Sequence, residues 1–261
     1  MKVGIIGYGS MGKMLFERIM NSKMISPDDL YVSNRTFEKI EDLPCQVCKT
    51  NVELADIVDI VFVCVKPNDI CYVLGEIKPF LKEEKLVVSL NANVLFGVMG
   101  NVLDHKIAKV VPSVTAEVGK SQTLVCFNEK VPEKDKVFLK ELLTCMGDVY
   151  ELKEHEMGMG SELVSCMPGF IAAMFDVVCT SAEKHISFPK EQILKMVLRT
   201  LDATSTMMVE KEMSFENVVK RVATPGGITE EGTKVIYEEF PDTASKVFEV
   251  TLEKRKIIAK G

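Results

Sequence analysis

A short apolar strand at the amino terminus runs directly into a glycine motif, and this junction constrains the fold more than any other feature. The sequence begins Met-Lys-Val-Gly-Ile-Ile and continues as Gly7-Tyr8-Gly9-Ser10-Met11-Gly12, which has the spacing G-x-G-x-x-G. In dinucleotide-binding folds the first glycine permits a tight turn, the second lets a pyrophosphate approach the backbone, and the third lets the next helix pack on the sheet. A helical pattern from about residue 11 to 20 and a second strand at Leu30–Val32 complete the required βαβ unit.

The residues at the end of this second strand bear on which dinucleotide is bound. An NAD site typically places Asp or Glu there to accept from the ribose 2′-hydroxyl, but this sequence reads Ser33-Asn34-Arg35-Thr36. A hydroxyl, an amide and a guanidinium suit a 2′-phosphate, although Arg35 is also explained as a solvated residue at a helix start. We expect NADP(H) to be preferred, with NAD(H) as the alternative cofactor.

The first part of the chain alternates buried strands with helical segments, which is the pattern of a doubly wound α/β domain. Apolar runs occur at residues 60–65, 86–90, 107–111 and 122–127, with a last short strand near 149–150 and an amphipathic helix at 132–143. These runs predict a parallel sheet whose ligands bind at the carboxyl ends of the strands. The loops expected to face the cofactor are residues 7–11, 33–36, 64–68, 91–93 and 112–115.

From about residue 153 the pattern becomes helical only. Helices are predicted at residues 158–163, 168–179, 189–210, 214–222 and 230–260. We therefore predict an N-terminal NADP-binding Rossmann domain, residues 1–152, followed by an all-α domain, residues 153–261. The helices carry apolar residues on more than one face, so we expect this domain to bury them against a second copy, in a homodimer or a higher homo-oligomer.

Composition and charge exclude several classes of function. The chain has 261 residues, 47% of them hydrophobic, and a net charge of −6 without a basic stripe, so we expect neither a nucleic-acid nor an anionic-membrane partner. No uninterrupted apolar run approaches the roughly 18 residues of a membrane span, and the amino terminus lacks the pattern of a signal peptide. We expect a cytoplasmic protein.

The eight cysteines are expected to be reduced, and several of them lie inside apolar runs. Cys45 and Cys48 have C-x-x-C spacing, which is compatible with half of a zinc site or with a redox pair. There is no second such pair, and the three histidines are scattered without ligand spacing. A structural role is favoured for both cysteines, and no metal is expected.

A second glycine motif, Ala223-Thr224-Pro225-Gly226-Gly227-Ile228-Thr229, lies just before the last predicted helix. Pro225 fixes one φ angle and the two glycines permit positive φ, so that consecutive backbone N–H groups can converge on one point. With Thr229 as the predicted N-cap, the positive end of the helix dipole would favour a bound carboxylate. The alternative is a capped turn between two helices.

Four features in this order make the chain resemble pyrroline-5-carboxylate reductase over nearly its whole length. They are the glycine-rich start, the V-K-P at residues 65–67, the V-P-S-V-T-A at residues 111–116 and the A-T-P-G-G-I-T loop. The resemblance implies reduction of the cyclic imine 1-pyrroline-5-carboxylate to L-proline, in proline biosynthesis, by hydride from NADPH or NADH. It also implies an interlocked dimer, in which the second glycine loop completes the neighbour's site.

The resemblance also implies roles for individual residues. The pyrophosphate would be held by Gly7, Tyr8, Gly9, Ser10 and Met11. The adenosine ribose or its phosphate would meet Ser33, Asn34 and Arg35, and the ribose and nicotinamide would meet Asn51, Val65, Lys66 and Pro67. The substrate carboxylate would be held by Thr224, Gly226, Gly227, Ile228 and Thr229.

Hydride transfer is the cofactor's own chemistry, so the protein has to orient the two reactants and favour a polarised imine. A threonine hydroxyl can donate toward the developing amine, which assigns Thr229 a catalytic role. Lys66 is the other candidate donor, and its alternative role is to pack its stem under the cofactor.

Two segments depart from the family pattern. The family usually has M-P-N-T-P-A where this chain has Val111–Ala116, and S-G-S-G-P-A where it has Val164–Gly169, so that Met167 replaces a glycine. In these segments the chain resembles relatives of the family that are encoded in late-competence operons. The alternatives are therefore a regulatory relative without turnover and a reductase of another small cyclic imine.

Overall fold

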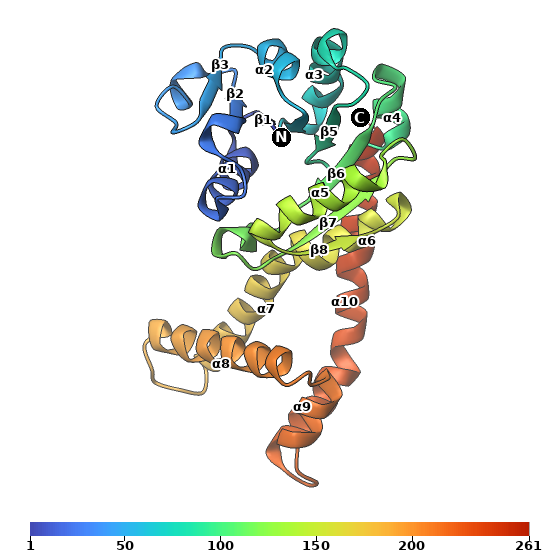
Figure 1. Ribbon diagram of the computed structural model, residues 1–261. Helices are drawn as coiled ribbons and strands as arrows, with labels where there is room; N and C mark the ends of the chain where they lie inside the picture. The colour runs from blue at the N-terminus through green and yellow to red at the C-terminus, as the bar shows by residue number, and fades with distance from the viewer. Residues whose placement is uncertain (261) are drawn as a thin grey trace. The chain divides into compact units, whose positions relative to one another are not determined.

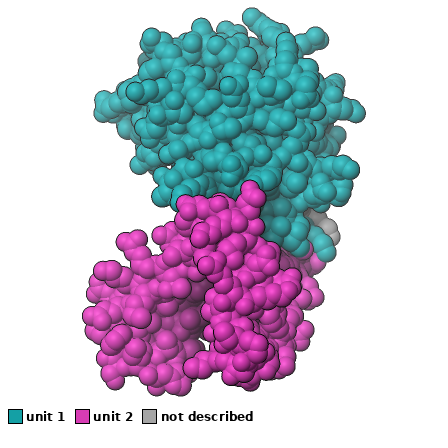
Figure 2. All heavy atoms as spheres, turned by 60° about the horizontal axis from the view of Figure 1, so that its bottom comes forward, with its two compact units in different colours: residues 1–168, 254–261 teal, residues 169–253 magenta. Residues whose placement is uncertain are grey.

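The structure is a computed structural model that describes residues 1–260 (Figure 1). Contacts between residues divide the chain into two compact units (Figure 2). Residues 1–168 and the C-terminal residues from Lys254 form the first unit, and residues 169–253 form the second. The predicted domain boundary at residues 152 and 153 stays a prediction.

The first unit is built on one eight-stranded sheet with the strand order β3-β2-β1-β4-β5-β6-β7-β8. The six neighbouring strands β3, β2, β1, β4, β5 and β6 all run parallel to one another. In chain order the strands are β1 (Val3–Ile6), β2 (Leu30–Ser33), β3 (Gln46–Cys48), β4 (Ile60–Val63), β5 (Leu86–Ser89), β6 (Ile107–Val111), β7 (Ser121–Phe127) and β8 (Gly147–Glu151). The sequence predicts this doubly wound pattern and five of these six parallel strands, whereas the short, partly exposed strand β3 is not predicted.

Strand β7 runs antiparallel to β6, so the prediction of a wholly parallel sheet is wrong at this point. The two strands are joined by residues 112–120, which form only a short 3-10 turn at Val114–Val118. A parallel connection needs a crossover of about a dozen residues or more, so this link can only reverse the chain. Strand β8 then returns parallel to β7 after helix α5 (Glu133–Leu143).

Helices cover both faces of the sheet and enclose a large core on each face, with a third, smaller cluster at Val111, Leu124, Cys126 and Met157. On one face, α1 (Ser10–Ser22) and α5 contribute buried residues such as Leu15 and Leu139. On the other face, α2 (Asn51–Ile57), α3 (Ile70–Ile77) and α4 (Phe96–Val102) contribute buried residues that include Leu54 and Leu74. Because successive side chains of a strand point to opposite faces, each parallel strand feeds both cores and reads as a continuous apolar run.

Residues 154–182 form one continuous helical segment, where the sequence predicts two helices with a break. It comprises α6 (Met157–Ser161), a π-helical turn at Glu162–Cys166 and α7 (Met167–Ala182). By length and composition alone, this segment is long and apolar enough to cross a membrane. Only 6% of its most apolar window is buried inside the chain. The helix thus presents apolar surface that the chain itself does not cover.

The second unit is all-helical and lacks a core of its own. Besides the rest of α7 it contains α8 (Lys190–Glu210), α9 (Phe215–Val222) and most of α10 (Ile228–Lys260). Among its described hydrophobic side chains, Cys179 and Ile193 are buried. Its exposed large hydrophobic side chains include Val177, Val178, Leu194, Met196, Leu198, Val209, Phe215, Val235, Ile236 and Val250. Helices that bury so little apolar area need a partner surface to be stable.

Candidate active site at the carboxyl edge of the sheet

The turn from β1 into α1, where the sequence predicts a pyrophosphate site, is tight on one side and open on the other. Gly7 has φ of +96°, and its N–H donates to the Ser33 carbonyl at 2.9 Å. A Cβ on Gly12 would lie 1.9 Å from the Gly7 carbonyl oxygen, whereas a Cβ on Gly9 meets no described heavy atom within 4 Å. The turn is therefore closed on its inner side at Gly12 and open on its outer side at Gly9.

Helix α1 begins at this open side with its N–H groups available to an anion. Its N-cap is Gly9, which has no capping side chain, and its first turn contains no acidic residue. Ser10 and Met11 are exposed there. The N-terminal N–H groups and the helix dipole together favour a phosphate at this position.

Tyr8 and Asn34 join the glycine turn to the end of β2. The Tyr8 N–H donates to Asn34 Oδ1 at 3.0 Å, and Asn34 Nδ2 donates to the Thr36 carbonyl at 2.8 Å. The Tyr8 amide is therefore already paired. The Tyr8 ring packs edge-on against Phe16, with 5.7 Å between ring centroids. Arg35 is exposed next to Asn34, where its guanidinium can reach a ligand.

Ser33 and Asn51 form a pair beneath this surface. The Ser33 side chain is buried, and its hydroxyl donates to Asn51 Oδ1 at 2.9 Å. Asn51 Nδ2 donates in turn to Glu76 Oε2 at 2.8 Å. These hydrogen bonds connect β2 to α2 and α3, and they occupy the side-chain polar groups of Ser33 and Asn51 that the sequence assigns to the ribose. Both side chains therefore bond within the protein.

The V-K-P segment follows β4 and lies beside the glycine turn. The Cys64 N–H donates to the Ile6 carbonyl at 2.8 Å, and a Cβ on Gly7 would lie 3.2 Å from Val65 Cγ1. Lys66 and Pro67 are exposed, and Pro67 opens the 3-10 turn Pro67–Asp69 that leads into α3. The structure thus brings Val65 together with Gly7, and the exposed Lys66 lies at the same edge of the sheet.

The loops after β5 and β6 are held mainly by their own polar side chains. The Asn93 N–H donates to Asn91 Oδ1 at 2.8 Å, and the buried Ser113 caps the 3-10 turn by accepting from the Thr115 N–H. The Ser113 N–H donates to Ser121 Oγ at 3.0 Å. These bonds fix the backbone at the carboxyl edge, where ligands of this fold bind.

Lys109 of β6 is fully buried and pairs with Glu154, with 2.9 Å between Nζ and Oε1. The same carboxylate oxygen accepts from the Phe96 N–H at 2.7 Å, and the ammonium lies 5.2 Å from the Phe96 ring centroid. One carboxylate therefore anchors both the start of α4 and the middle of β6. The sequence analysis did not identify this pair, because two charges 45 residues apart carry no local pattern.

The second glycine loop, in the second unit, is a tight turn that already binds a carboxylate. Gly226 has φ of +71°, its N–H donates to Glu230 Oε2 at 2.7 Å, and the Gly227 N–H donates to the Thr224 carbonyl at 2.8 Å. Thr224 and Thr229 are exposed. The amide of Gly226 thus has the geometry to hold a carboxylate, and in the chain by itself Glu230 supplies one.

The prediction that Thr229 caps the last helix is wrong. Helix α10 begins at Ile228, so Thr229 is its second residue, and the Gly227 carbonyl accepts the first helical bond from the Glu231 N–H at 3.4 Å. The helix begins two residues earlier than the sequence pattern indicates, and Glu230 reaches back to the Gly226 N–H as an acidic capping side chain. The Thr229 hydroxyl is left at the exposed start of the helix. Ile228 is 94% exposed.

The C-x-x-C pair does not form a common site. Cys45 packs against the core that contains Leu15, whereas Cys48 belongs to the core on the opposite face of the sheet. Burial raises the pKa of each thiol to about 11, with a smaller contribution to Cys45 from Cys48 and to Cys48 from Glu53. Thiols of this kind are weak nucleophiles and weak ligands at neutral pH, which favours the structural role.

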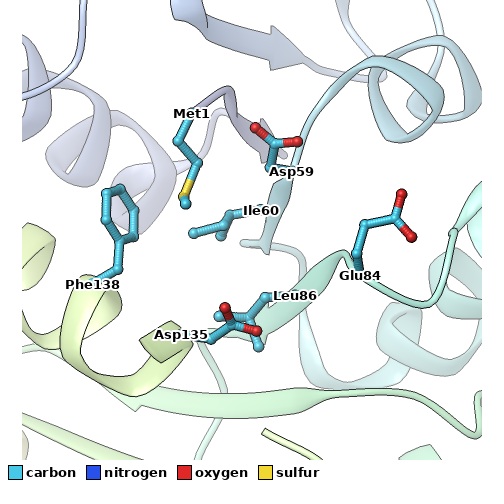
Figure 3. A pocket seen from close by; sticks show the side chains of 7 residues that line it. All are labelled: Met1, Asp59, Ile60, Glu84, Leu86, Asp135 and Phe138. Carbon is cyan, nitrogen blue, oxygen red and sulfur yellow. The ribbon is translucent and has the colours of Figure 1, made fainter. Parts of the chain in front are cut away.

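A small cavity lies at the opposite, amino edge of the sheet (Figure 3). Its lining residues are Met1, Asp59, Ile60, Glu84, Leu86, Asp135 and Phe138. Two of its carboxylates are already engaged, since Asp59 accepts from the Lys2 N–H at 2.8 Å and Asp135 pairs with Lys106 at 3.0 Å. The amino edge of a doubly wound sheet is not where its ligands bind, so we assign the cavity no role in the chemistry.

Comparison with known proteins gives matches over almost the whole chain. Residues 2–93 match the family model "NADP oxidoreductase coenzyme F420-dependent", and residues 154–257 match "Pyrroline-5-carboxylate reductase dimerisation". Pyrroline-5-carboxylate reductase 3 of Bacillus subtilis is 32% identical over 99% of this chain and 97% of its own. ComE operon protein 4 of the same organism is 26% identical over 96% of this chain and 94% of its own.

A solved structure agrees with these sequence matches. The Plasmodium falciparum pyrroline carboxylate reductase, solved with NADP bound, superposes with a TM-score of 0.87 at 25% identity and covers 99% of this chain and 98% of its own. The match confirms the fold class, a Rossmann domain followed by an all-α dimerisation domain. The match to the dimerisation model agrees with the uncovered apolar surface of the second unit.

Proposed function

Because this chain belongs to the pyrroline-5-carboxylate reductase family, we propose that it reduces 1-pyrroline-5-carboxylate to L-proline with hydride from NADPH. The observation that carries the proposal is the presence in one chain of an open dinucleotide turn and a glycine loop that binds a carboxylate. The first would hold the hydride donor and the second the acid group of the imine. The chain self-associates through its C-terminal helices, as the match to the dimerisation model indicates.

The residues of the carboxyl edge support NADP(H) as the dinucleotide. The pyrophosphate would lie over Gly9 against the N–H groups of Ser10 and Met11, where α1 lacks a capping side chain. The ribose phosphate would lie near Asn34 and Arg35 at the end of β2. Ser33 and Asn51 would then support this surface rather than touch the phosphate, because their polar groups bond to each other.

NADPH supplies the hydride when it is bound, and the protein residues arrange the acceptor and supply the proton. The substrate carboxylate would replace the Glu230 carboxylate at the Gly226 N–H, and the other members of the loop, Thr224, Gly227 and Ile228, would shape the surrounding cup. The hydride would add to the imine carbon, C2 of 1-pyrroline-5-carboxylate, which becomes C5 of proline, while the ring nitrogen would gain a proton. The Thr229 hydroxyl would donate toward that nitrogen as its basicity rises, a contact that strengthens during the reaction.

Lys66 is proposed to lie near the nicotinamide end of the site. It is exposed after β4, beside Val65 and the glycine turn. A mobile ammonium there can attract the anionic substrate and donate to the imine, whereas a purely packing role would depend on its aliphatic stem. Exchange of Lys66 for methionine separates these roles, because methionine keeps the stem and removes the charge.

Turnover of the imine by the purified protein tests the proposal. NADPH should be oxidised when 1-pyrroline-5-carboxylate is added and should persist without it. Thr229→Ala should lower kcat by about 10²-fold, the usual effect of losing a donor to the reacting group. Thr144→Val, which removes an exposed hydroxyl of the first unit, is the matched control and should leave kcat unchanged. Absence of imine-dependent oxidation in the wild type would overturn the proposal.

Two other functions have a specific observation in their favour. The match to ComE operon protein 4 and the presence of Met167 directly after the π-helical turn favour a relative that binds dinucleotide without turnover. The same methionine would favour another small cyclic imine if it reshapes the pocket. NADPH binding without reduction of any imine in a panel supports the relative without turnover, and faster reduction of a different ring supports the reductase of another imine. We also propose that the protein is located in the cytoplasm and has neither a nucleic-acid nor a membrane partner.

A further inference from the structure

Arg255, near the end of α10, is the centre of a polar cluster in the first unit. Its Nη1 donates to Asn93 Oδ1 at 2.6 Å, and its Nη2 donates to Glu162 Oε1 at 2.8 Å and to Ser161 Oγ at 3.2 Å. Its Nε is 3.3 Å from the same Glu162 oxygen. The guanidinium therefore joins the C-terminal helix, the end of α6 and the loop after β5.

The cluster is largely withdrawn from water. Glu162 is 1% exposed and the side chain of Arg255 is 19% exposed. Glu162 Oε2 is buried, and within residues 1–260 it has no hydrogen-bond partner. A buried ion pair with an unsatisfied oxygen contributes little net stability compared with an apolar substitute of the same shape. A role in geometry explains the presence of this pair better than a role in stability does.

Asn93 stands at the part of the sheet edge that the nicotinamide should reach. The pyrophosphate turn follows β1 and the ribose loop follows β2, so the dinucleotide extends in the other direction over β4 and β5. The loop after β5 is bonded to that neighbour, since the Leu90 N–H donates to the Val63 carbonyl at 3.1 Å. Asn93 is three residues farther along, with its side-chain oxygen on Arg255.

We propose that Arg255 is a positioning residue for hydride transfer, which holds Asn93 and thereby the β5–α4 loop against the nicotinamide end of the dinucleotide. The inference rests on the proposed function in that NADPH is the hydride donor. Hydride transfer requires the reacting atoms to be about 3–3.5 Å apart, and a displacement of about 1 Å can cost two orders of magnitude in rate. A loop held on one side only would allow such displacements.

The bond pattern requires arginine rather than a positive charge alone. The planar fork reaches Asn93 with one nitrogen and Glu162 with two others, so it bridges two segments at fixed geometry. A lysine at this position keeps the charge beside Glu162 but has a single nitrogen and cannot hold both partners. Arg255→Lys therefore separates positioning from charge neutralisation.

The experiment compares Arg255→Lys and Asn93→Ala with a matched control, Lys106→Met. Lys106 forms a partly buried ion pair with Asp135 at the amino edge of the sheet, so its loss costs a comparable contact away from the site. The readouts are kcat, KM for the imine, the Kd of NADPH from its fluorescence, and the melting temperature. Both test variants should lose about tenfold or more in kcat and bind NADPH several-fold more weakly, with little change in KM for the imine. The control should lose stability only.

Chemical rescue gives a readout that a merely structural role would not move. Millimolar guanidinium should restore part of kcat to Arg255→Ala and none to Asn93→Ala, because only the first leaves a guanidinium-shaped space. If Arg255→Ala does not fold, Asn93→Ala still decides the matter, since it removes one amide at a partly buried position.

Three results would overturn the inference. The first is an unchanged kcat in both test variants. The second is a loss of kcat that is no larger than the loss in Lys106→Met for the same fall in melting temperature. The third is a folded Arg255→Ala protein whose kcat guanidinium does not restore. A wild type that binds NADPH without reducing the imine would refute the proposed function instead. The inference is then decided by NADPH affinity alone, and equal affinity of Arg255→Lys and wild type would refute it.

Discussion

Gly9→Ala should weaken NADPH binding by about one to two orders of magnitude while leaving the fold intact. Gly9 has φ of −84° and ψ of −168°, a backbone conformation that alanine adopts freely. The added Cβ meets none of the described heavy atoms within 4 Å, so the protein itself offers no clash. The methyl group would occupy the space through which the pyrophosphate approaches the N–H groups of Ser10 and Met11.

The size of the effect follows from the bonds that the methyl group prevents. A hydrogen bond to a charged group is worth about 1.5–3 kcal/mol. Loss of one such bond to the pyrophosphate corresponds to a Kd about 10- to 150-fold weaker, at 1.4 kcal/mol for each factor of ten. The free energy of unfolding should change by less than about 0.5 kcal/mol, the usual range for exposed positions.

Titration of NADPH fluorescence and urea unfolding together measure both quantities. Gly100→Ala is the control, because Gly100 is exposed inside α4 and its Cβ also meets no described atom within 4 Å. That variant should be stabilised by about 0.5–1 kcal/mol and should bind NADPH normally. A Gly9→Ala protein with wild-type affinity for NADPH would refute the assignment of this turn as the pyrophosphate site.

Four further outcomes are expected. Gly12→Ala places a Cβ 1.9 Å from a backbone oxygen, so it should destabilise by about 1–3 kcal/mol or more in urea unfolding and also weaken NADPH binding. Lys109→Met leaves Glu154 without its ammonium and should cost about 3 kcal/mol in the same assay; an unchanged midpoint would contradict the account of this pair. Arg35→Ala should weaken binding of NADPH roughly tenfold and that of NADH little, measured by paired titrations. Because burial raises the pKa of Cys45 to about 11, its alkylation should be slow at pH 8 and should accelerate with each pH unit up to about that value; fast labelling at pH 8 would refute the burial.

The sequence identified the first half of the sheet well because local pattern and topology agree there. Each buried parallel strand is a continuous apolar run, and the G-x-G-x-x-G motif fixes the order of the first elements. The direction of β7 was missed because an apolar run reads alike in either direction. Only the length of the connection at residues 112–120 distinguishes the two, since it is too short for a crossover.

The candidate site was predictable where a motif is contiguous and not where it is assembled across the chain. The glycine turn and the loop at residues 224–229 were found from adjacent residues. The sequence places residue 93 in a loop that faces the cofactor, but it does not reveal the contacts of Arg255 with Asn93 and Glu162, because a contact between positions 162 residues apart leaves no periodic signal. The predicted start of α10 is two residues too late, since Gly226 pairs with Glu230 in a way that the capping preference of threonine does not reveal.

Transfer of deuterium tests the central claim most directly. The wild-type protein is incubated with 1-pyrroline-5-carboxylate and NADPH that carries deuterium at C4 of the nicotinamide on the transferred face, and the product is analysed by mass spectrometry. The account predicts L-proline with one deuterium at C5, formed in step with NADPH oxidation. Proline without deuterium, or NADPH oxidation that yields no proline, would contradict it.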